Sequence, residues 1–482
     1  MISFGRSYEV PWLDSLSIQG HDAKRAVSSA ASTSDVVSGG ELVAEGVAVR
    51  MVDLREPVPP LADVGEHDRV RVYAFLGDQI LGFVEIDNWG RPLSARRVRE
   101  ALVAALGLKP IAALVNSSES VAYALLLEDL RQKLLPQVGN RDGTQTRPTL
   151  DLEVSASVVV ATFDRPEDLR KVLACIKAQR TSRRVEIVVV DNNPASGLTA
   201  PVVADFPDIV LVREAKQGLA YARNAGIRGS SGDVIVMTDD DVTAPADWLE
   251  KLLAPFARVD VAAVTGNVLP LELSTKAQRL FEVYGGLGKG FQRIEAGSGW
   301  FERARSAVPT WRLGASANAA FRASIFAERE IGFMHEALGP GTPAGVGEDT
   351  YLFYKLLKAG YTLVYEPSAY VWHRHRRDMA SLRQQLYSYS KGHVAYHLTT
   401  LLEDRDLRAL PYLTLQLPVG HLRRLRWRLR GDSPYPVSLS LVEIGGNLMG
   451  PFALWSSRRR AHREGTTTPR MRDLRSPAEE QS

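Results

Sequence analysis

The feature that most constrains the fold is an alternation of short apolar runs with helical segments between about residues 155 and 241. Runs rich in β-branched residues predict strands at 155–161, 185–190, 209–213 and 234–237. Apolar periodicity predicts a helix over 166–178, and a glycine-led segment predicts another from 216 to 226. Strands that alternate with helices favour a parallel sheet with right-handed crossovers. The predicted fold class is therefore α/β, with a mostly parallel sheet flanked by helices.

Three consecutive carboxylates, Asp239, Asp240 and Asp241, follow the last of these strands. Open α/β sheets bind their ligands at the carboxyl ends of their strands. If the strand continues that far, alternation places Asp239 and Asp241 on one side and Asp240 on the other. Two hard oxygen ligands in this arrangement suit Mg²⁺ or Mn²⁺ that carries a diphosphate. The alternative for the triplet by itself is a solvated acidic turn.

The length and composition predict a globular chain of several domains. The chain has 482 residues, of which 45% are hydrophobic and 24% are charged. A polar, turn-rich stretch at 139–148 marks the expected main boundary. We predict a disordered leader at 1–40, a small α+β accessory module at 41–140, a catalytic domain at 151–390, a helical, basic and amphipathic extension at 391–464, and a disordered tail at 465–482.

The accessory module contains apolar runs at 69–76 and 79–86, which predict a hairpin. Ser94 is placed to cap a helix over 95–106, and a second apolar helical stretch covers about 120–135. The module has no catalytic spacing, so we expect a docking or packing role.

The single cysteine, Cys175, excludes an intramolecular disulfide and fits a reducing compartment. The N-terminus lacks the charge and apolar pattern of a signal peptide, and no uninterrupted apolar run is long enough to span a bilayer. These observations predict a cytoplasmic protein.

Several further motifs follow the strands in order. They are Ala161-Thr-Phe-Asp-Arg165, Val189-Val-Asp-Asn-Asn193, Gly218-Leu-Ala-Tyr-Ala-Arg-Asn-Ala-Gly226, Asp239-Asp-Asp241, Gly314-Ala-Ser-Ala-Asn-Ala-Ala-Phe-Arg322 and Gly347-Glu-Asp349. In this order they resemble glycosyltransferase family 2, with the GT-A fold, over about residues 155–375. The resemblance implies a metal-dependent, inverting, hexosyltransferase-like enzyme of the kind used in polysaccharide biosynthesis. Its donor would be a nucleoside diphosphate sugar, expected to be UDP-linked, and its acceptor a hydroxyl on a glycan, a lipid-linked sugar or a small molecule.

The resemblance also implies a donor site. The residues that it assigns to the donor are Thr162, Asp164, Arg165, Asp191, Asn192, Gly218, Arg223, Asn224, Asp239, Asp240, Ser316 and Asn318. The ordinary structural alternatives are turns, a surface arginine, buried-loop hydrogen bonds and, for Asp164 with Glu167, a helix capping box.

The resemblance implies a metal site for Mn²⁺ or Mg²⁺ at Asp239, Asp241 and His373. Asp241 is expected to coordinate directly, and Asp239 to contact the metal or the donor ribose. His375 is the alternative to His373, and a generic basic loop is the alternative for both histidines.

An inverting transfer needs a base on the acceptor side. By resemblance Asp349 is this base and Glu348 orients it or the acceptor, although the two roles could be reversed and either residue could simply cap a helix. The glycine-rich stretch from Tyr284 to Trp300 is expected to be a mobile loop over the acceptor side.

The C-terminal region combines arginines with apolar residues. Residues 421–430 alternate leucines with arginines, and residues 437–455 are apolar but interrupted by Glu443, Asn447 and Pro451. These interruptions favour a helix that lies on the anionic inner face of the cell membrane over one that spans it. The alternative is a helical cap packed on the catalytic domain. Nucleic acid is not an expected partner, because no base-stacking module is apparent.

Two rival functions remain from the sequence. One is a catalytically inactive scaffold that binds a sugar nucleotide; retention of Asp241 and Asp349 disfavours it. The other is a sugar-phosphate nucleotidyltransferase, which would need a glycine-rich basic loop after the first strand. Residues 162–166 do not supply one.

Overall fold

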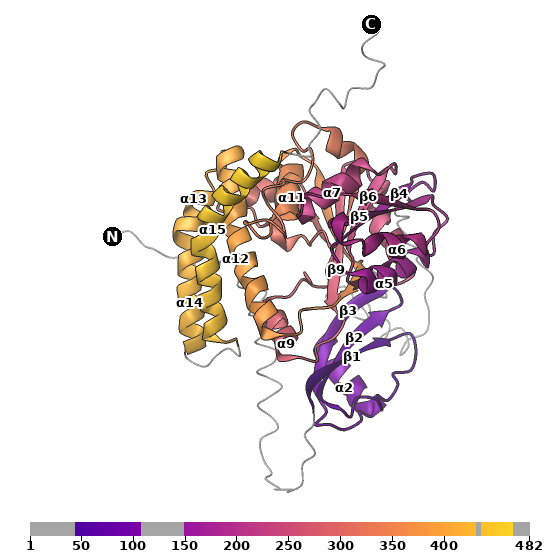
Figure 1. Cartoon of the computed structure of the whole chain (residues 1–482). Coiled ribbons are helices and arrows are strands. Elements are labelled where there is room, and N and C mark those ends of the chain that lie inside the picture. Colours follow the sequence, from indigo (N-terminus) through magenta and orange to yellow (C-terminus); the bar gives the residue numbers. More distant parts are fainter. Residues whose placement is uncertain (1–43, 108–148, 430–434, 466–482) are drawn as a thin grey trace, which may run out of the picture.

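The computed structural model describes residues 44–107, 149–429 and 435–465 (Figure 1). The strands of its central sheet are β4 Ala156–Thr162, β5 Val185–Asp191, β6 Ile209–Arg213, β7 Val234–Asp239, β8 Val242–Thr243, β9 Val261–Pro270, β10 Ile294–Ala296, β11 Asn318–Arg322 and β12 Thr362–His373. The helices around this sheet are α5 Pro166–Lys177, α6 Thr199–Ala204, α7 Leu219–Arg228, α8 Trp248–Leu253, α9 Lys276–Tyr284, α10 Ser298–Arg303 and α11 Glu348–Lys358. The strands and helices predicted between residues 155 and 239 agree closely with this list.

The central sheet is nine-stranded and mixed, in the order β10-β12-β9-β11-β7-β4-β5-β6, with β8 paired to β12 outside this order. Strands β4, β5, β6 and β7 are parallel, as predicted, and β11 runs antiparallel between β7 and β9. The chain builds β5 and β6 on one side of β4 and then returns to place β7 on the other side. The carboxyl ends of β4 and β7 therefore meet at a topological switch point, which is where such sheets bind ligands.

Both faces of the sheet are covered, because side chains alternate along each strand. Val158 and Val160 of β4 join the core under α5, α6 and α8, to which Leu169 also belongs. Val159 points to the opposite core under α7 and α11, together with Leu352. Burial on both faces explains why the central strands are continuous apolar runs. The predicted α/β fold class is confirmed.

Within residues 44–107 the N-terminal module is a small sheet with one helix. It consists of β1 Ala44–Asp53, β2 His67–Leu76, β3 Gln79–Asp87 and α2 Ala95–Leu106, with a core of its own. The predicted hairpin is confirmed by the antiparallel pairing of β2 with β3, and Ser94 caps α2. Tyr73 of β2 packs edge-on against Trp372 of β12, which joins the module to the central sheet. The predicted helical stretch at 120–135 lies outside the described residues, as do the leader and nearly all of the tail.

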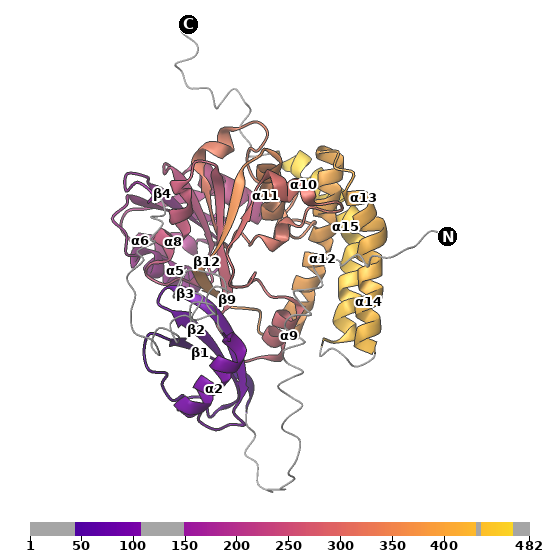
Figure 2. The same ribbon diagram turned by 180° about the vertical axis from the view of Figure 1, so that it is seen from behind.

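The C-terminal region is helical and stands beside the central sheet (Figure 2). Its elements are α12 Met379–Glu403, α13 Ala409–Pro411, a π-helical turn at Tyr412–Gln416, α14 Leu417–Leu429 and α15 Val437–Glu464. Helix α12 runs without a break through the predicted boundary at 390/391, so the helical region begins earlier than the sequence suggested.

Helix α15 packs closely along α12. A Cβ on Gly446 would lie 2.6 Å from the carbonyl oxygen of Tyr387, and one on Gly450 would lie 2.5 Å from the Cβ of Val394. These glycines therefore permit the close approach of the two helices. Within the described residues α15 is the one helix that is long and apolar enough to cross a membrane, with a window of mean hydropathy 1.3. The expectation that this segment is too polar to span is therefore not supported by its hydropathy, although Pro451 does lie within it.

Candidate active site

A cleft of about 1720 Å³ opens at the carboxyl ends of β4 and β7 and extends to α12 and α14. The predicted residues that line it are Thr162, Arg165, Asn192, Gly218, Arg223, Asp239, Asp240, Asp241, Ser316, Glu348, Asp349 and His373. The fold thus gathers residues from distant motifs into one space. Its volume exceeds that of most small-molecule pockets, so two ligands could bind side by side.

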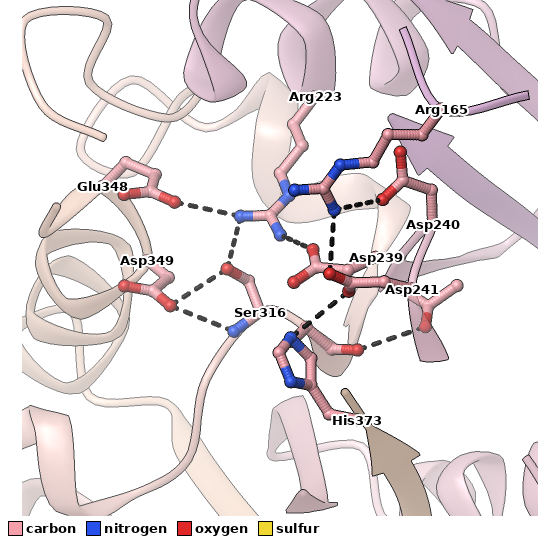
Figure 3. A network of polar contacts seen from close by, with 11 residues as sticks. Arg165, Arg223, Asp239, Asp240, Asp241, Ser316, Glu348, Asp349 and His373 are labelled. Carbon is pink, nitrogen blue, oxygen red and sulfur yellow. Dashed lines mark hydrogen bonds and ion pairs between the residues drawn. The ribbon is translucent and has the colours of Figure 1, made fainter. Parts of the chain in front are cut away.

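Asp239, Asp241 and His373 form a cluster in which one potential ligand atom from each residue lies within 4.8 Å of the others. Asp239 ends β7, and Asp241 lies in the turn before β8. Strand β8 pairs with the end of β12, with Val242 opposite His373, and this pairing brings the histidine beside Asp241. His373 Nε2 lies 3.2 Å from Asp241 Oδ1 (Figure 3). Two carboxylates and an imidazole are a donor set that fits Mn²⁺ or Mg²⁺.

Asp240 has a different role from its neighbours. Its Oδ2 accepts a hydrogen bond from Thr162 Oγ1 at 2.8 Å, and its Oδ1 accepts one from Arg165 Nη1 at 3.1 Å. Burial raises the pKa of Asp240 to about 6, although Arg165 opposes this shift. Arg165 also contacts Asp241 Oδ2 at 2.8 Å (Figure 3). Asp240 therefore anchors the acidic turn to β4.

The Asp241 carboxylate is ionised despite its burial. Burial opposes its charge, but the hydrogen bond from His373 and the positive charges of His373 and Arg165 hold its pKa well below the usual range. A carboxylate that remains charged is suited to coordinating a cation.

Arg223 joins three motifs that are far apart in the sequence. Its buried guanidinium donates to Asp239 Oδ1 at 2.8 Å, to Ser316 Oγ at 2.5 Å and to Glu348 Oε1 at 3.0 Å (Figure 3). The surface alternative for this arginine is wrong, because its side chain is 3% exposed. Arg223 thereby fixes the position of the acidic turn relative to the start of α11.

Asp349 and Glu348 begin α11 but have different surroundings. Asp349 Oδ2 accepts hydrogen bonds from the backbone N–H and the hydroxyl of Ser316, both at 3.0 Å. Its Oδ1 accepts from the N–H of Thr350 at 2.6 Å. Glu348 is buried against Arg223, and burial together with the charge of Asp349 raises the pKa of Glu348 to about 7. The two carboxylates therefore differ in exposure, since Glu348 is buried and Asp349 is half-buried.

Part of the predicted donor site is held by internal hydrogen bonds of the loops after β4 and β5. Asn192 reaches the cleft and also ties down the next motif, because its Oδ1 accepts from the N–H of Gly218 at 2.9 Å. Asp164 and Asp191 do not line the cleft, and both contact Asn193. The proposed capping box is wrong. The N-cap of α5 is Arg165, without a side-chain cap hydrogen bond, and Asp164 has a positive φ of 54°.

Two predicted donor contacts, Asn224 and Asn318, are core residues in this structure. Asn224 Nδ2 donates to the carbonyl of Met334 at 2.9 Å. Asn318 accepts from the indole N–H of Trp248 at 2.9 Å and donates to the carbonyl of Ala369 at 2.8 Å. Neither residue lines the cleft. Their side chains instead form hydrogen bonds with buried backbone and side-chain groups, so the structure does not support the predicted donor contacts.

His375 is excluded from the metal cluster by its partner. Its Nε2 lies 3.0 Å from Glu282 Oε1, and Phe281 packs edge-on against its ring. The choice of His373 over His375 in the prediction therefore matches the geometry of the cluster.

The cleft also contains Lys289 and Arg376, which are not among the predicted site residues. Burial lowers the pKa of Lys289 to about 8. The sequence signal that could have indicated Lys289 was its position as a lone lysine in the glycine-rich stretch. The part of that stretch up to Ile294 lines the cleft, and the remainder continues into β10 (Ile294–Ala296) and α10 (Ser298–Arg303).

Comparison with known proteins identifies the family of this fold and site. The family model "Glycosyl transferase family 2" matches residues 157–329. The succinoglycan biosynthesis protein ExoM of Rhizobium meliloti is 30% identical over 237 residues, which covers 46% of this chain and 68% of that protein. The pre-mycofactocin glycosyltransferase of Mycobacterium tuberculosis is 28% identical over 230 residues. That match covers 46% of this chain and less than half, 43%, of the relative.

The chain belongs to glycosyltransferase family 2. Among solved structures, the mannosyltransferase PcManGT from Pyrobaculum calidifontis, in complex with GDP-Man and Mn²⁺, aligns over 74% of this chain and 88% of that one. Its TM-score is 0.38 and its sequence identity is 18%.

Proposed function

We propose that the chain is a metal-dependent, inverting glycosyltransferase. It transfers a sugar from a nucleoside diphosphate sugar, UDP-linked, to a hydroxyl on a glycan, a lipid-linked sugar or a small molecule. The observation that supports this most is the shared cleft of the Asp239, Asp241 and His373 cluster and the Asp349 carboxylate. Ser316 contacts both Arg223 and Asp349, so the two halves of the site are rigidly connected.

The residues present fit a divalent cation, which Asp239, Asp241 and His373 would hold. When bound, Mn²⁺ or Mg²⁺ neutralises charge that develops on the diphosphate leaving group. Arg376 and Lys289 add positive charge to the same cleft, where the donor phosphates would bind. Thr162, Arg165, Asn192 and Gly218 line the cleft at the carboxyl end of the sheet, and we assign them to the nucleotide.

Asp349 is the proposed general base. It accepts the proton of the acceptor hydroxyl while that oxygen forms a bond to the anomeric carbon of the sugar. The bond from this carbon to the diphosphate breaks, and its electron pair leaves with the nucleoside diphosphate. The hydrogen bonds from Ser316 hold Asp349 in place for this transfer. Glu348 is buried against Arg223, so we assign it the positioning role.

Donor turnover with Mn²⁺ tests this proposal. Asp349→Asn is expected to lower transfer and donor hydrolysis by roughly 10²–10⁴-fold while donor affinity persists. Asp205→Asn, an exposed carboxylate paired with Arg170, is the matched control and should behave as wild type. Wild-type rates in Asp349→Asn would overturn the assignment of the base. A wild-type protein that binds donor without turnover would favour an inactive scaffold, and release of pyrophosphate from a nucleotide and a sugar phosphate would favour a nucleotidyltransferase.

The nucleotide is tested by thermal shift. UDP-, GDP- and dTDP-sugars are each added with Mn²⁺, because a ligand that binds only the native state raises its unfolding temperature. We expect the largest rise in unfolding temperature with a UDP-sugar. A larger rise with a GDP- or dTDP-sugar would replace UDP as the proposed nucleotide.

We also propose that the protein is cytoplasmic and that α14 and α15 contact the anionic inner face of the membrane. Both helices present apolar side chains that are more than half exposed, namely Leu415, Val419, Leu422, Leu429, Leu441, Leu448, Phe452 and Trp455. Leu415 belongs to the π-helical turn that leads into α14. Arg423, Arg426 and Arg459 are exposed among them, and each could add about 1 kcal/mol near an anionic surface. Arg424 and Arg428 instead turn inward and pair with the buried Glu443.

Vesicle flotation tests the membrane contact. Leu448→Glu with Phe452→Glu is expected to abolish binding to vesicles that contain phosphatidylglycerol. Val259→Glu is the control, because Val259 is an exposed apolar residue outside the helical region. Unchanged flotation in the double variant would contradict the proposal. Resistance to extraction by alkaline carbonate would instead indicate that α15 spans the membrane.

A further inference from the structure

The side of the cleft opposite the acidic turn is a wall built by the C-terminal helices. Along α12 the cleft residues recur at helical spacing, so one face of the helix is turned toward the space that also contains Asp349. The wall residues used below are Trp311, Gln385, Tyr389, His393, Tyr412, His421 and Asn447. We call these residues the helical wall.

The helical wall is joined to the segment of the proposed base through the turn that contains Trp311. Trp311 lies in the 3₁₀ turn Thr310–Arg312, and Thr310 Oγ1 donates to the carbonyl of Thr350 at 2.9 Å. Thr350 is the neighbour of Asp349. A ligand that contacts the wall can therefore present a hydroxyl to Asp349 while the donor occupies the acidic side.

Two buried amide oxygens in the wall have no hydrogen-bond partner among the described residues. Gln385 uses its Nε2 to donate to the hydroxyl of Tyr389 at 3.1 Å, which leaves its Oε1 unpaired. Asn447 lies 2.6 Å from His421 Nε2 through its Nδ2, and its Oδ1 is likewise unpaired. A buried acceptor without a donor is energetically unfavourable. Such oxygens suit a ligand that carries O–H groups.

Aromatic rings lie among these polar groups. Trp311 packs edge-on against His393 with ring centroids 4.8 Å apart, and His393 Nε2 lies 2.7 Å from the hydroxyl of Tyr412. Aromatic rings offer an apolar face with a polar edge, which matches a ring that has C–H faces and hydroxyl edges. An acyl chain would leave the amide oxygens of Gln385 and Asn447 unpaired.

We propose that the helical wall is the acceptor subsite and that it binds a polyhydroxylated sugar ring. This inference rests on the proposed glycosyltransferase function and narrows its acceptor to a saccharide unit, free or at the head of a lipid. Gln385 and Asn447 accept hydrogen bonds from its hydroxyl groups, and Trp311 and Tyr389 contact its apolar faces.

The test uses the full-length protein with Mn²⁺ and the donor selected by thermal shift. The probes are nitrophenyl glycosides of glucose, galactose, mannose and N-acetylglucosamine. We expect at least one glycoside to accept sugar, and Gln385→Leu and Asn447→Leu to raise its KM about tenfold, because each removes a hydrogen bond. The donor KM of both variants should equal that of wild type. Arg383→Ala is the control, since Arg383 is exposed and does not line the cleft.

An unchanged glycoside KM in both leucine variants would overturn the subsite. Absence of donor turnover in wild type would instead defeat the proposed function. In that case saturation-transfer NMR of the same glycosides still tests the proposed acceptor subsite. The proposal fails if no glycoside binds, or if a glycoside binds equally well to wild type and to Gln385→Leu. A second arm uses glucosyl polyprenyl phosphate in detergent micelles. Preference for glucosyl polyprenyl phosphate over the free glycoside would identify the acceptor as a lipid-linked saccharide. Preference for the glycoside would identify it as a free saccharide.

Discussion

Arg71 Nη1 on β2 lies 2.8 Å from Glu282 Oε2 on α9, so the N-terminal module supplies a counter-ion to the central domain. Both side chains are mostly buried, at 9% and 19% exposure. The other oxygen of Glu282 lies 3.0 Å from His375 Nε2, and His375 Nδ1 lies 3.4 Å from His373 Nδ1. The pair thus connects the module to the neighbourhood of the Asp239, Asp241 and His373 cluster.

Replacing Arg71 is expected to destabilise the fold strongly. Arg71→Met leaves Glu282 with one fewer partner in a buried position, which costs about 3 kcal/mol. The measurement is chemical denaturation. Arg69→Met is the control, because Arg69 is 48% exposed and its ion pair with Asp87 is worth less than about 1 kcal/mol. Equal losses in the two variants would show that the burial of Arg71 has no energetic consequence.

Replacement of His373, at the end of β12, and of His375, two residues later, is expected to have different consequences. His373→Ala should weaken Mn²⁺ binding by roughly 10–100-fold or more, because it removes a proposed ligand of the cluster. His375→Ala should instead lower stability, because it removes a partner of Glu282. Mn²⁺ titration followed by electron paramagnetic resonance, together with thermal unfolding, separates the two outcomes. A greater loss of Mn²⁺ affinity in His375→Ala would reverse the assignment.

The raised pKa of Glu348 predicts a pH-dependent stability. Burial raises this pKa to about 7 from an ordinary 4.5. The folded state therefore binds a proton that the unfolded state has released, and this contribution is present below pH 4.5 and lost as the pH rises through 7. By linkage the change is on the order of 3 kcal/mol. Glu348→Gln should remove it, so the variant gains stability relative to wild type between pH 5 and pH 8 in thermal unfolding. A constant difference across this range would contradict the prediction.

Replacing two helical glycines with alanine should change the free energy of unfolding in opposite directions. A Cβ on Gly226 of α7 would lie 2.4 Å from Val159 Cγ1, so Gly226→Ala should cost about 1–3 kcal/mol through overpacking. Gly445 of α15 has its nearest neighbour at 4.0 Å, so Gly445→Ala should gain up to about 1 kcal/mol from helix propensity. Denaturation midpoints of both variants check the pair. A gain in stability for Gly226→Ala would show that α7 can move away from β4.

Motifs that lie within one turn or one strand end were predictable from the sequence. The apolar run before Asp239 gives a buried strand whose carboxyl end faces the ligand side, because strand periodicity and sheet topology are local rules. Spacing therefore placed Asp239 and Asp241 together at this strand end. For Asp349, local periodicity predicted only the helix that it helps to begin, and the role proposed for this residue came from the resemblance to the family.

Other features depended on contacts between distant segments. Whether His373 or His375 faces Asp241 is decided by the pairing of β8 with β12, which spacing does not encode. Asn224 and Asn318 resemble donor contacts in their motifs, yet the buried carbonyls of Met334 and Ala369 engage their amides.

The sequence by itself determined the α/β class and the acidic turn at the end of its strand, because both depend on local periodicity. The choice of Asp349 as the base came from the resemblance to the family and stays a proposal. Only the tertiary structure decided that Asp240 binds Arg165 and Thr162, that Arg223 joins Asp239 to Glu348, and that the C-terminal helices wall the cleft. The physical reason is that a buried charge or amide must find its partner, and that partner can come from any part of the chain.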